Sequence, residues 1–547
     1  MRYNKRIQVI KMAIYSNILI DIPEDKGVHI KTSGVKGEKY VYKHVKYFRN
    51  AEGKPRNKSK SIGKFDIQTG KMFPNDNYFA IYQVDPLITD VSVWDYGYSY
   101  LILKVCRSMG LLDCLTQAFG NTCSMDIVIM AAYIVREGNA MDGLEDWQHR
   151  NYFHKHKRKL SSQATSKIFA SLTAGQINDF FIHWVKIAMS EGGVCYDVTS
   201  ISSYAKEMVS VERGYNRDRE NLAQFNLGMF CDELTKTPIY YNRYNGSLTD
   251  KKNLSYVLAN AEAVGIKRVK IIVDGGFCDK YCVTSLHELC DAFTMGLPLS
   301  LKEAEVVFTK RNNETKQYIN KLSQPYTHMY CVEEEMTFYG VSGKAFLYFD
   351  ALNHVFLCGE LSEKIDRLKA ELSALKRYPK SKLKRYSAYF KLTKHEHDSG
   401  FDYEVDVEKV EDACKKKGYF MIFSTDEHAT PEDILYYYRE KDVVEKMFAQ
   451  IKCDMEGNRI RTHNEQTTDG KVFVTFVACI IRSYLLRKLT GYMKDNTTTL
   501  KKVLNQLANI TILSNSNGLR FTKALTKKQR EILQSFDAYD DILNSLN

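Results

Sequence analysis

The sequence predicts an α/β protein whose mixed five-stranded sheet, with flanking helices, is interrupted by a long insertion. Short apolar runs typical of buried strands surround one helical pattern, and the strand pattern resumes only after a long gap. The expected strands cover residues 193–199, 225–231, 238–244, 269–273 and 418–424, with a helix over 251–264. The chain has 547 residues, 44% apolar and 26% charged, so it can bury several cores.

The regions around this core complete the predicted organisation. Apolar spacing over 98–109, 125–136 and 177–189 is helical. Within the insertion we expect strands at 329–332, 345–349 and 354–357 and a charged helix at 362–375. The expected segments are a basic β-rich N-terminal module (1–90), a helical domain (91–190), the first part of the core (191–299), the insertion (300–417), the second part of the core (418–490) and a helical C-terminal region (491–547).

The positive charge of the chain is concentrated near its N-terminus. Lys and Arg number 78 and Asp and Glu 66, a surplus of 12, and twelve basic but only two acidic residues lie between Lys26 and Lys64. Basic residues alternate there with Tyr and Phe over 40–48, as in a strand, and residues 50–55 supply a turn. A solvated basic hairpin without a ligand is one interpretation. The other is a surface that contacts DNA phosphates, and the residues that we expect to bind DNA are Lys54, Arg56, Lys58 and Lys60.

Several classes of protein are disfavoured. The longest uncharged apolar stretches, such as 127–135 and 472–481, are shorter than the roughly 20 residues of a membrane-spanning helix. The 13 cysteines are odd in number and lack zinc-finger spacing, which predicts reduced thiols in a cytoplasmic protein.

Residues 430–452 are predicted to form one helix. Thr430 is its expected N-cap, Pro431 takes the first helical position and Asp433 is the acidic member of a capping box. At 100° per residue, the polar side chains that share about 60° of one face are Tyr438, Lys441, Glu445 and Lys452. This stripe suits a carboxylate that binds a divalent metal beside cations that hold phosphate oxygens. A solvated polar face is the plainer alternative.

Two aspartates lie near the ends of apolar strands. Asp197 is in the first strand, and Asp274 directly follows the strand 269–273 and precedes two glycines that leave room for a ligand. A charge in such a place is costly unless it is paired or binds a metal. Two carboxylates from adjacent strands and a third from a packed helix can hold two Mg²⁺ ions, activate a water or a 3′-hydroxyl and stabilise the leaving oxygen of a phosphodiester.

The chain resembles a known family at these residues. The spacing Tyr438-x2-Lys441-x3-Glu445-x6-Lys452 is similar to the Y-(2)-R-(3)-E-(6)-K signature of insertion-sequence DDE transposases, the IS-four-like group. The stretches 196–200, 245–250, 272–277 and 473–486 are also similar, and the resemblance covers roughly residues 193–488. It implies an RNase H-like catalytic core with a β-rich insertion ahead of the glutamate helix.

The resemblance implies roles for individual residues. Asp197, Asp274 and Glu445 would form the catalytic triad and bind two Mg²⁺ ions, with Mn²⁺ as a substitute. The residues that would contact transposon-end DNA are Tyr438, Lys441 and Lys452. The implied partners are double-stranded DNA, as terminal inverted repeats and target, and a second copy of the chain in a homodimeric synaptic complex. The implied location is the cytoplasm of a prokaryote, at the nucleoid, without a membrane.

Two residues depart from the family pattern. Lys441 replaces the usual Arg, which exchanges a bidentate phosphate contact for a point charge. Gly275 stands where related sequences often carry Arg. A base-stabilising Trp near the insertion of some relatives has no counterpart, because the only tryptophans are Trp94, Trp147 and Trp184.

Other functions were weighed against an active transposase. A DNA-binding protein of transposase ancestry without catalysis stays open. A tyrosine recombinase is excluded because no His is followed three positions later by Arg. A Cys–His hydrolase lacks a marked general base, so Cys195 is expected in the core. The basic runs at 376–385 and 154–159 suit either DNA contact or a solvated loop.

Overall fold

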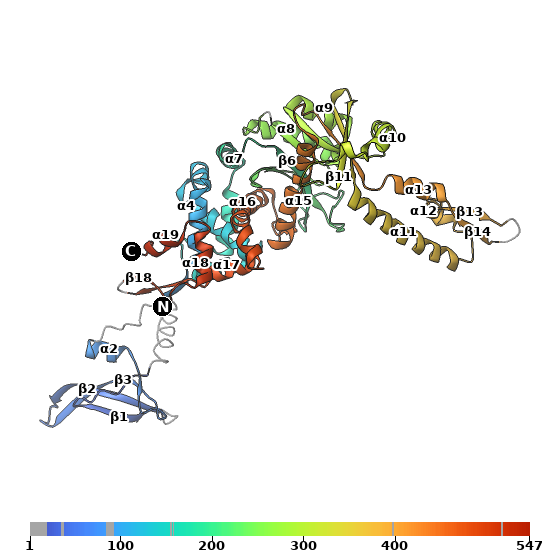
Figure 1. The fold of residues 1–547 in the computed structure, drawn as a ribbon. Coiled ribbons are helices and arrows are strands. Elements are labelled where there is room, and N and C mark those ends of the chain that lie inside the picture. Colours follow the sequence, from blue (N-terminus) through green and yellow to red (C-terminus); the bar gives the residue numbers. More distant parts are fainter. Residues whose placement is uncertain are drawn as a thin grey trace. The chain divides into compact units, whose positions relative to one another are not determined.

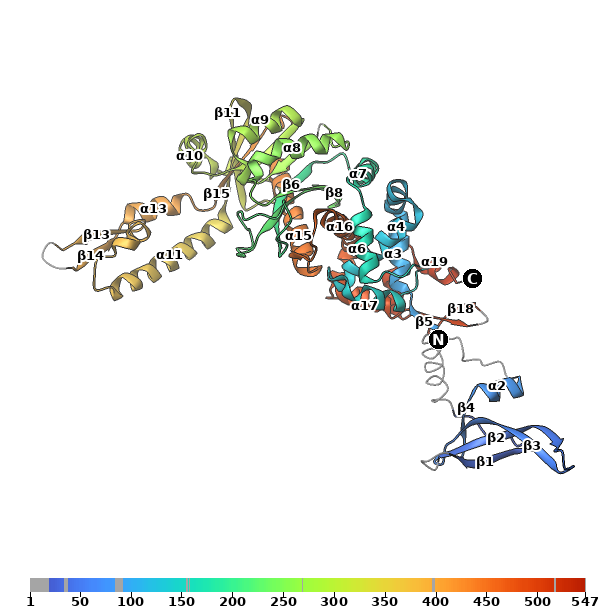
Figure 2. The same ribbon diagram turned by 180° about the vertical axis from the view of Figure 1, so that it is seen from behind.

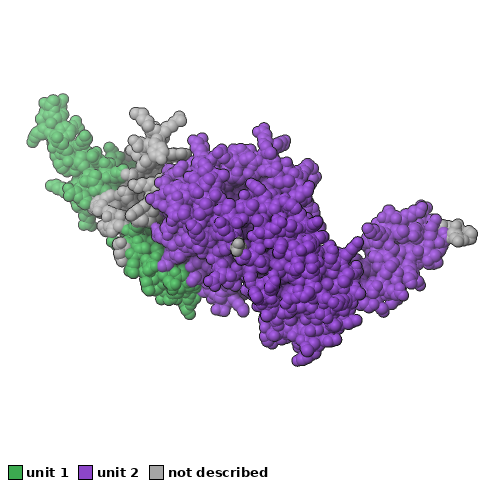
Figure 3. All heavy atoms as spheres, turned by 90° about the horizontal axis from the view of Figure 1, so that it is seen from above, with its two compact units in different colours: residues 1–100, 149–152, 502–547 green, residues 101–148, 153–501 purple. Residues whose placement is uncertain are grey.

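The computed structural model describes residues 19–33, 38–83, 92–153, 156, 158–267, 269–395, 399–515 and 518–546. The chain divides into two compact units, coloured separately in Figure 3. Unit 1 contains residues 1–100, 149–152 and 502–547, and unit 2 contains residues 101–148 and 153–501. Of the predicted run 154–159, residues 154, 155 and 157 lie outside the described residues.

Unit 1 begins with an antiparallel four-stranded sheet of order β1-β2-β3-β4, followed by the helix α2. The elements are β1 (Val28–Ser33), β2 (Glu38–Arg49), β3 (Pro55–Phe65), β4 (Met72–Pro74) and α2 (Asp76–Tyr82). The strand predicted over 40–48 is confirmed as part of β2. Val41, Ile62 and Met72 are fully buried and form a small core, so most of this sheet remains open to solvent.

The second sheet of unit 1 joins chain segments that are far apart in sequence. β17 (Thr511–Asn515) pairs antiparallel with both β5 (Ser92–Asp95) and β18 (Gly518–Phe521). The C-terminal region was expected to be helical throughout, and this expectation is wrong for these strands. β17 and β18 pair with each other, and β17 also pairs with the distant β5, which a local sequence pattern cannot reveal. The helices of this region are α17 (Leu500–Ala508), α18 (Lys527–Gln534) and α19 (Tyr539–Asn544).

The helices predicted at 98–109, 125–136 and 177–189 are confirmed, although the segment 91–190 also contains β5 and is divided between the two units. Its helices are α3 (Gly97–Ser108), α4 (Leu111–Glu137), α5 (Leu144–Arg150), α6 (Ser162–Ser171) and α7 (Ala174–Ala188). By length and composition, α4 is the one helix among the described residues that could cross a membrane. It is longer than the uncharged apolar stretch 127–135, which it contains. Of its most apolar window, 61% is buried inside the structure, where α4 packs on α16 (Glu465–Asp495).

Unit 2 is built on a mixed sheet of nine strands rather than the five predicted. The order is β11-β12-β15-β10-β9-β6-β7-β8, and a short β16 pairs with β6. Their bounds are β6 (Val194–Ser203), β7 (Gln224–Asp232), β8 (Pro238–Asn245), β9 (Lys270–Val273), β10 (Ala292–Leu297), β11 (Met329–Phe338), β12 (Val341–Asp350), β15 (Tyr419–Ser424) and β16 (Arg459–Ile460). All five predicted strands are present, and β10 adds a parallel neighbour to β9.

Helices cover both faces of this sheet (Figures 1 and 2). One face carries α8 (Asp250–Ala263), α9 (Lys280–Leu289) and α10 (Lys302–Thr315). The other carries α14 (Pro431–Glu440), α15 (Asp442–Ala449) and α16. The alternation of side chains along each strand therefore decides which helices a residue faces.

The predicted insertion differs from the expectation of a β-rich domain. Its strands β11 and β12 extend the main sheet through β15, because their apolar residues pair along its edge. The rest, residues 351–415, forms an arm that is largely helical, shown beyond the sheet in Figure 1. Its elements are α11 (Ala351–Ala374), α12 (Leu383–Tyr386), the hairpin β13 (Phe390–Lys394) and β14 (Phe401–Val405), and α13 (Val407–Lys415).

The strand expected at 354–357 is wrong, since these residues lie inside α11. The Asp350 side chain accepts a hydrogen bond from the Asn353 backbone N–H and caps the helix four residues before this apolar run. The predicted helix at 362–375 is confirmed as the second half of α11.

Candidate active site

Strand pairing places Asp197 and Asp274 beside each other. The parallel strands β6 and β9 pair Val194 with Ile271 and Cys195 with Ile272. Asp197 and Asp274 each lie two residues beyond the second pair, so they reach the same level on the same face of the sheet. That face is the one covered by α14 and α15 (Figure 1).

The predicted helix 430–452 forms in two parts, α14 and α15, joined at Lys441. Its start is as predicted: Thr430 and Asp433 form a reciprocal capping box with Pro431 in the first turn. Lys441 keeps right-handed helical dihedral angles (φ −55°, ψ −25°), so Tyr438 and Glu445 stay on one side of the helix.

Two groups contact Asp274 directly. The Lys441 ammonium lies 3.2 Å from an oxygen of Asp274 and 2.9 Å from an oxygen of Glu445, so one cation bridges two predicted catalytic carboxylates. The Tyr438 hydroxyl donates a 3.3 Å hydrogen bond to the same Asp274 oxygen. Tyr438, Lys441, Asp274 and Glu445 thus form one connected network.

Gly296 on β10 makes room for this network, and sequence analysis missed it. A Cβ atom at position 296 would lie 2.3 Å from the Tyr438 hydroxyl oxygen and 3.0 Å from its ring. Only glycine therefore lets the ring reach Asp274 across the sheet. A glycine inside an apolar strand was the available signal.

Asp197 is the least compensated of the three carboxylates. Burial raises its pKa to about 6, and the negative charge of Asp274 adds to that increase. The Val198 backbone N–H, 2.7 Å away, and the positive charges of Arg217 and Lys441 lower the pKa only in part. A nearby divalent cation would favour the ionised form.

The neighbours of the carboxylates have shifted pKa values of their own. Burial, followed by the charge of Asp274, raises the pKa of Tyr438 to about 12, so this hydroxyl stays protonated. Burial lowers the pKa of Lys441, but the hydrogen bond to Glu445 and the charge of Asp274 outweigh it and hold the pKa above its usual value. Lys441 is therefore a fixed cation.

Lys452 does not share the network. Residues 450–454 form a π-helical turn, in which 100° per residue no longer applies, so the predicted common face ends before Lys452. Its ammonium instead pairs with Asp218 at 2.6 Å. Asp218 belongs to the loop after β6, whose role the sequence did not indicate.

The donor set suits a hard divalent cation. The three groups are carboxylates, the ligands that Mg²⁺ prefers, and two of them already share one positive charge. Among the described residues, however, no three His, Cys, Asp or Glu side chains lie close enough together to form a ready metal site. The residues that would hold the ion are Asp197, Asp274 and Glu445. The Lys441 ammonium now neutralises the charges of the last two.

The predicted DNA-binding residues of unit 1 form a separate surface. Arg56, Lys58 and Lys60 are exposed and lie two residues apart on β3, so they point to one face. Lys46 lies directly opposite Lys58, and Lys43 lies opposite Lys60. Lys54 is exposed at the hairpin end, with Glu52 at 3.2 Å.

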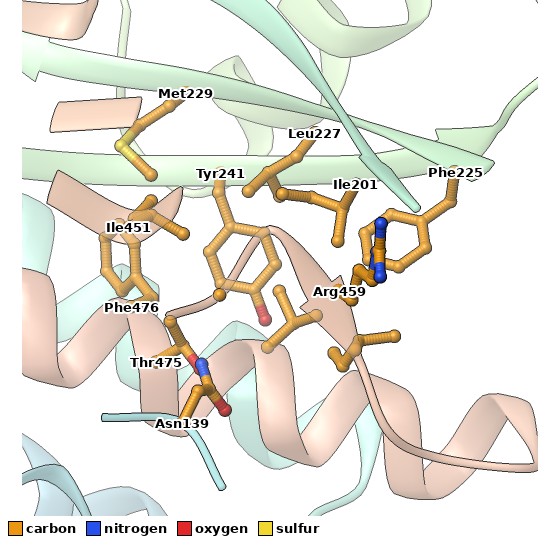
Figure 4. Close-up of a pocket in the computed structure, with 13 residues that line it drawn as sticks. Asn139, Ile201, Phe225, Leu227, Met229, Tyr241, Ile451, Arg459, Thr475 and Phe476 are labelled. Atoms are coloured by element: carbon orange, nitrogen blue, oxygen red, sulfur yellow. The ribbon is translucent and has the colours of Figure 1, made fainter. Parts of the chain in front are cut away.

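A cavity of about 20 Å³ lies between the sheet and α16 (Figure 4). Its wall is mainly apolar, with Leu227, Met229 and Phe476 pointing into it, and it has room for about one water molecule. It is a packing gap in the core.

Residues 189–481 match the family described as the transposase DDE domain. The match covers more than half of the chain, and the chain belongs to this family. Its function is DNA transposition.

No curated protein sequence gives a significant match. Among solved structures, one similar chain comes from the cryo-EM structure of a piggyBac transposase synaptic complex with hairpin DNA. It is 12% identical, with 86% of this chain and 84% of that chain covered and a TM-score of 0.34. A TM-score this low does not establish a common fold.

Proposed function

We propose that this transposase cleaves DNA strands at the ends of an insertion sequence and joins them to target DNA, using Asp197, Asp274 and Glu445. The observation that carries the proposal is the shared cation: the Lys441 ammonium contacts Asp274 and Glu445 at 3.2 and 2.9 Å, beside the register position of Asp197. Mg²⁺ ions bound there would stabilise the leaving oxygen and lower the pKa of an attacking water or 3′-hydroxyl.

The protein groups have distinct tasks in this scheme. Asp197 must be ionised to act, and its pKa of about 6 allows this at neutral pH. Tyr438 stays protonated and orients Asp274 through its hydrogen bond. Lys441 neutralises Asp274 and Glu445, and with a divalent cation bound to these carboxylates its ammonium would be able to contact a phosphate oxygen.

The wider assignments rest on the sequence resemblance. They are an RNase H-like core of the Y-R-E-K group, end-DNA contacts by Tyr438, Lys441 and Lys452, and phosphate contacts by the β3 residues. They also include terminal inverted repeats and target DNA as partners, a homodimeric synaptic complex, and a cytoplasmic, nucleoid-associated location in a prokaryote.

A cleavage assay tests the proposal. We expect wild-type protein to nick labelled insertion-sequence ends in Mg²⁺ or Mn²⁺, and Asp197→Asn, Asp274→Asn and Glu445→Gln each to lower the rate at least about 1,000-fold. DNA binding should stay within about threefold. Wild-type protein that binds the ends but never cuts them would instead support the inactive DNA-binding alternative.

A matched control separates charge loss at the site from charge loss elsewhere. Asp412 on the arm is exposed and pairs with Lys415 at 3.1 Å. Asp412→Asn removes the same charge from unit 2 and should leave cleavage unchanged.

A further inference from the structure

Another cavity of unit 2, of about 440 Å³ and lined partly by polar residues, lies at the N-terminal ends of α6 and α16. Its lining includes Lys471, Arg461 and Thr467 from the α16 side and Ser162 from α6. The volume is within the ~300–1,000 Å³ of ordinary ligand pockets. We call it the Lys471 cavity.

Lys471 is the unusual member of this lining. Lys471 is only 4% exposed, yet its ammonium has no hydrogen-bond or ion-pair partner within the described part of the chain. Burial, followed by the positive charge of Arg461, lowers the pKa of Lys471 to about 8. Lysines normally extend the ammonium to water, so a buried and unpaired one points to a missing anion.

The rest of the cavity also favours an anion. Arg461 is exposed and likewise has no partner among the described residues. Ser162 and Thr467 lie in the first turns of α6 and α16, where the helix dipole attracts negative charge; the Ser161 and Asn464 side chains cap one backbone N–H of each turn, that of Ala164 and that of Thr467. Asp142 is an acidic residue in the lining, and it is exposed at the rim.

The lining of this cavity adjoins that of another cavity beside Lys452. A neighbouring cavity of about 230 Å³ shares Ala140 and Arg461 with it and is also lined by Lys452 and Arg459. Those two cations are already paired, with Asp218 at 2.6 Å and Glu220 at 2.8 Å. The free positive charge along this path therefore belongs to Arg461 and Lys471.

We propose that the Lys471 cavity binds a phosphate group, held by Lys471 and Arg461, and that its source is a DNA strand that extends from the carboxylate site past Lys452. The choice of DNA rests on the proposed function. Free inorganic phosphate offers the same chemistry, so the experiment distinguishes the two sources.

The first measurement is DNA affinity in EDTA over a salt series. We expect Lys471→Met and Arg461→Gln each to weaken binding of insertion-sequence ends by about three- to tenfold and to lower the salt slope by about 1. Lys494→Met, an exposed lysine on the same helix, is the matched control and should change neither. Since Arg461 is exposed, its variant tests the site even where Lys471→Met fails to fold.

The second measurement is protection of Lys471 in wild-type protein from an amine-modifying reagent, read by mass spectrometry. Protection by equimolar DNA, with inorganic phosphate effective only at far higher concentration, supports the proposal. Protection by phosphate but not by DNA overturns the DNA source, and protection by neither overturns the site. Both readouts are taken without metal, so failure of cleavage would count against the proposed function alone.

Discussion

The carboxylate site of unit 2 and the basic face of β3 in unit 1 use positive charge in opposite ways. Lys441 at the carboxylate site contacts Asp274 and Glu445, and Lys452, which lies outside that network, contacts Asp218. On the N-terminal sheet, Lys58 and Lys60 of β3 lie opposite Lys46 and Lys43 of β2, and of these four lysines only Lys43 has an acidic partner among the described residues, Asp25 at 3.1 Å. Like charges in directly opposed positions destabilise a sheet.

The difference separates two tasks. A lysine that is paired with a carboxylate adds little net attraction for DNA. It holds the carboxylate in place until a ligand replaces one member of the ion pair. Unpaired lysines on a small sheet cost stability and gain attraction for a polyanion. We therefore expect substitutions in unit 2 to change chemistry and substitutions on β3 to change affinity.

The largest effect is expected for the unfolding free energy of the Asp197→Asn protein. The pKa of Asp197 is raised from 3.8 to about 6, so its ionisation opposes folding. This cost is absent below about pH 4, grows as the pH rises to about 6 and is then constant. In EDTA, Asp197→Asn should stabilise the protein by on the order of 3 kcal/mol at neutral pH and hardly at all at about pH 4. Chemical denaturation at both pH values measures it, and a pH-independent difference would contradict it.

The next effect concerns Lys441. Lys441→Met should lower single-turnover cleavage about 100-fold, because Asp274 and Glu445 lose their shared cation and the phosphate loses a donor. Lys441→Arg should retain most activity. If the methionine variant mainly lost DNA affinity, the proposed division between the two regions would not hold.

The basic face of β3 should respond in affinity. Replacing Arg56, Lys58 and Lys60 by Gln should weaken DNA binding about 10- to 100-fold and lower the salt slope by about 3, with the rate of the bound complex unchanged. The control removes three exposed lysines of the same unit, Lys523, Lys527 and Lys528. Equal losses of DNA affinity in both triple variants would show that the effect depends on net charge and not on the position of the β3 residues.

A smaller effect tests the packing behind the site. Gly296→Ala should destabilise the protein by about 1–2 kcal/mol and slow cleavage about tenfold, since its Cβ would displace the Tyr438 hydroxyl. Gly359→Ala, on the helix α11 of the arm, is the control, because a Cβ there meets no atom within 4 Å. Similar losses in both variants would show that the backbone, and not Tyr438, is responsible.

The sequence was informative where a local pattern determines position. Apolar strand patterns around Asp197 and before Asp274, with the capping box at Thr430, predicted the elements that carry the carboxylates, and those elements are present, although β6 continues past Asp197 to Ser203. The helical period placed Tyr438 and Glu445 on one side of the helix. There, Tyr438 contacts Asp274 and Glu445 contacts Lys441.

Features that depend on distant contacts were not predictable in this way. The joining of β11 and β12 to β15, the Gly296–Tyr438 approach and the pairing of Lys452 with Asp218 each unite residues far apart in the chain. The π-helical turn after α15 also breaks the period on which the position of Lys452 was based.

The most direct test of the central claim is iron-directed backbone cleavage. Fe²⁺ bound in place of Mg²⁺, with ascorbate and peroxide, generates radicals that cut the chain near the metal. We expect cuts close to residues 197, 274 and 445 in the wild-type protein, suppressed together by excess Mg²⁺ and by Asp274→Asn. Cuts that avoid these positions, or that persist unchanged in Asp274→Asn, would contradict a metal site shared by the three carboxylates.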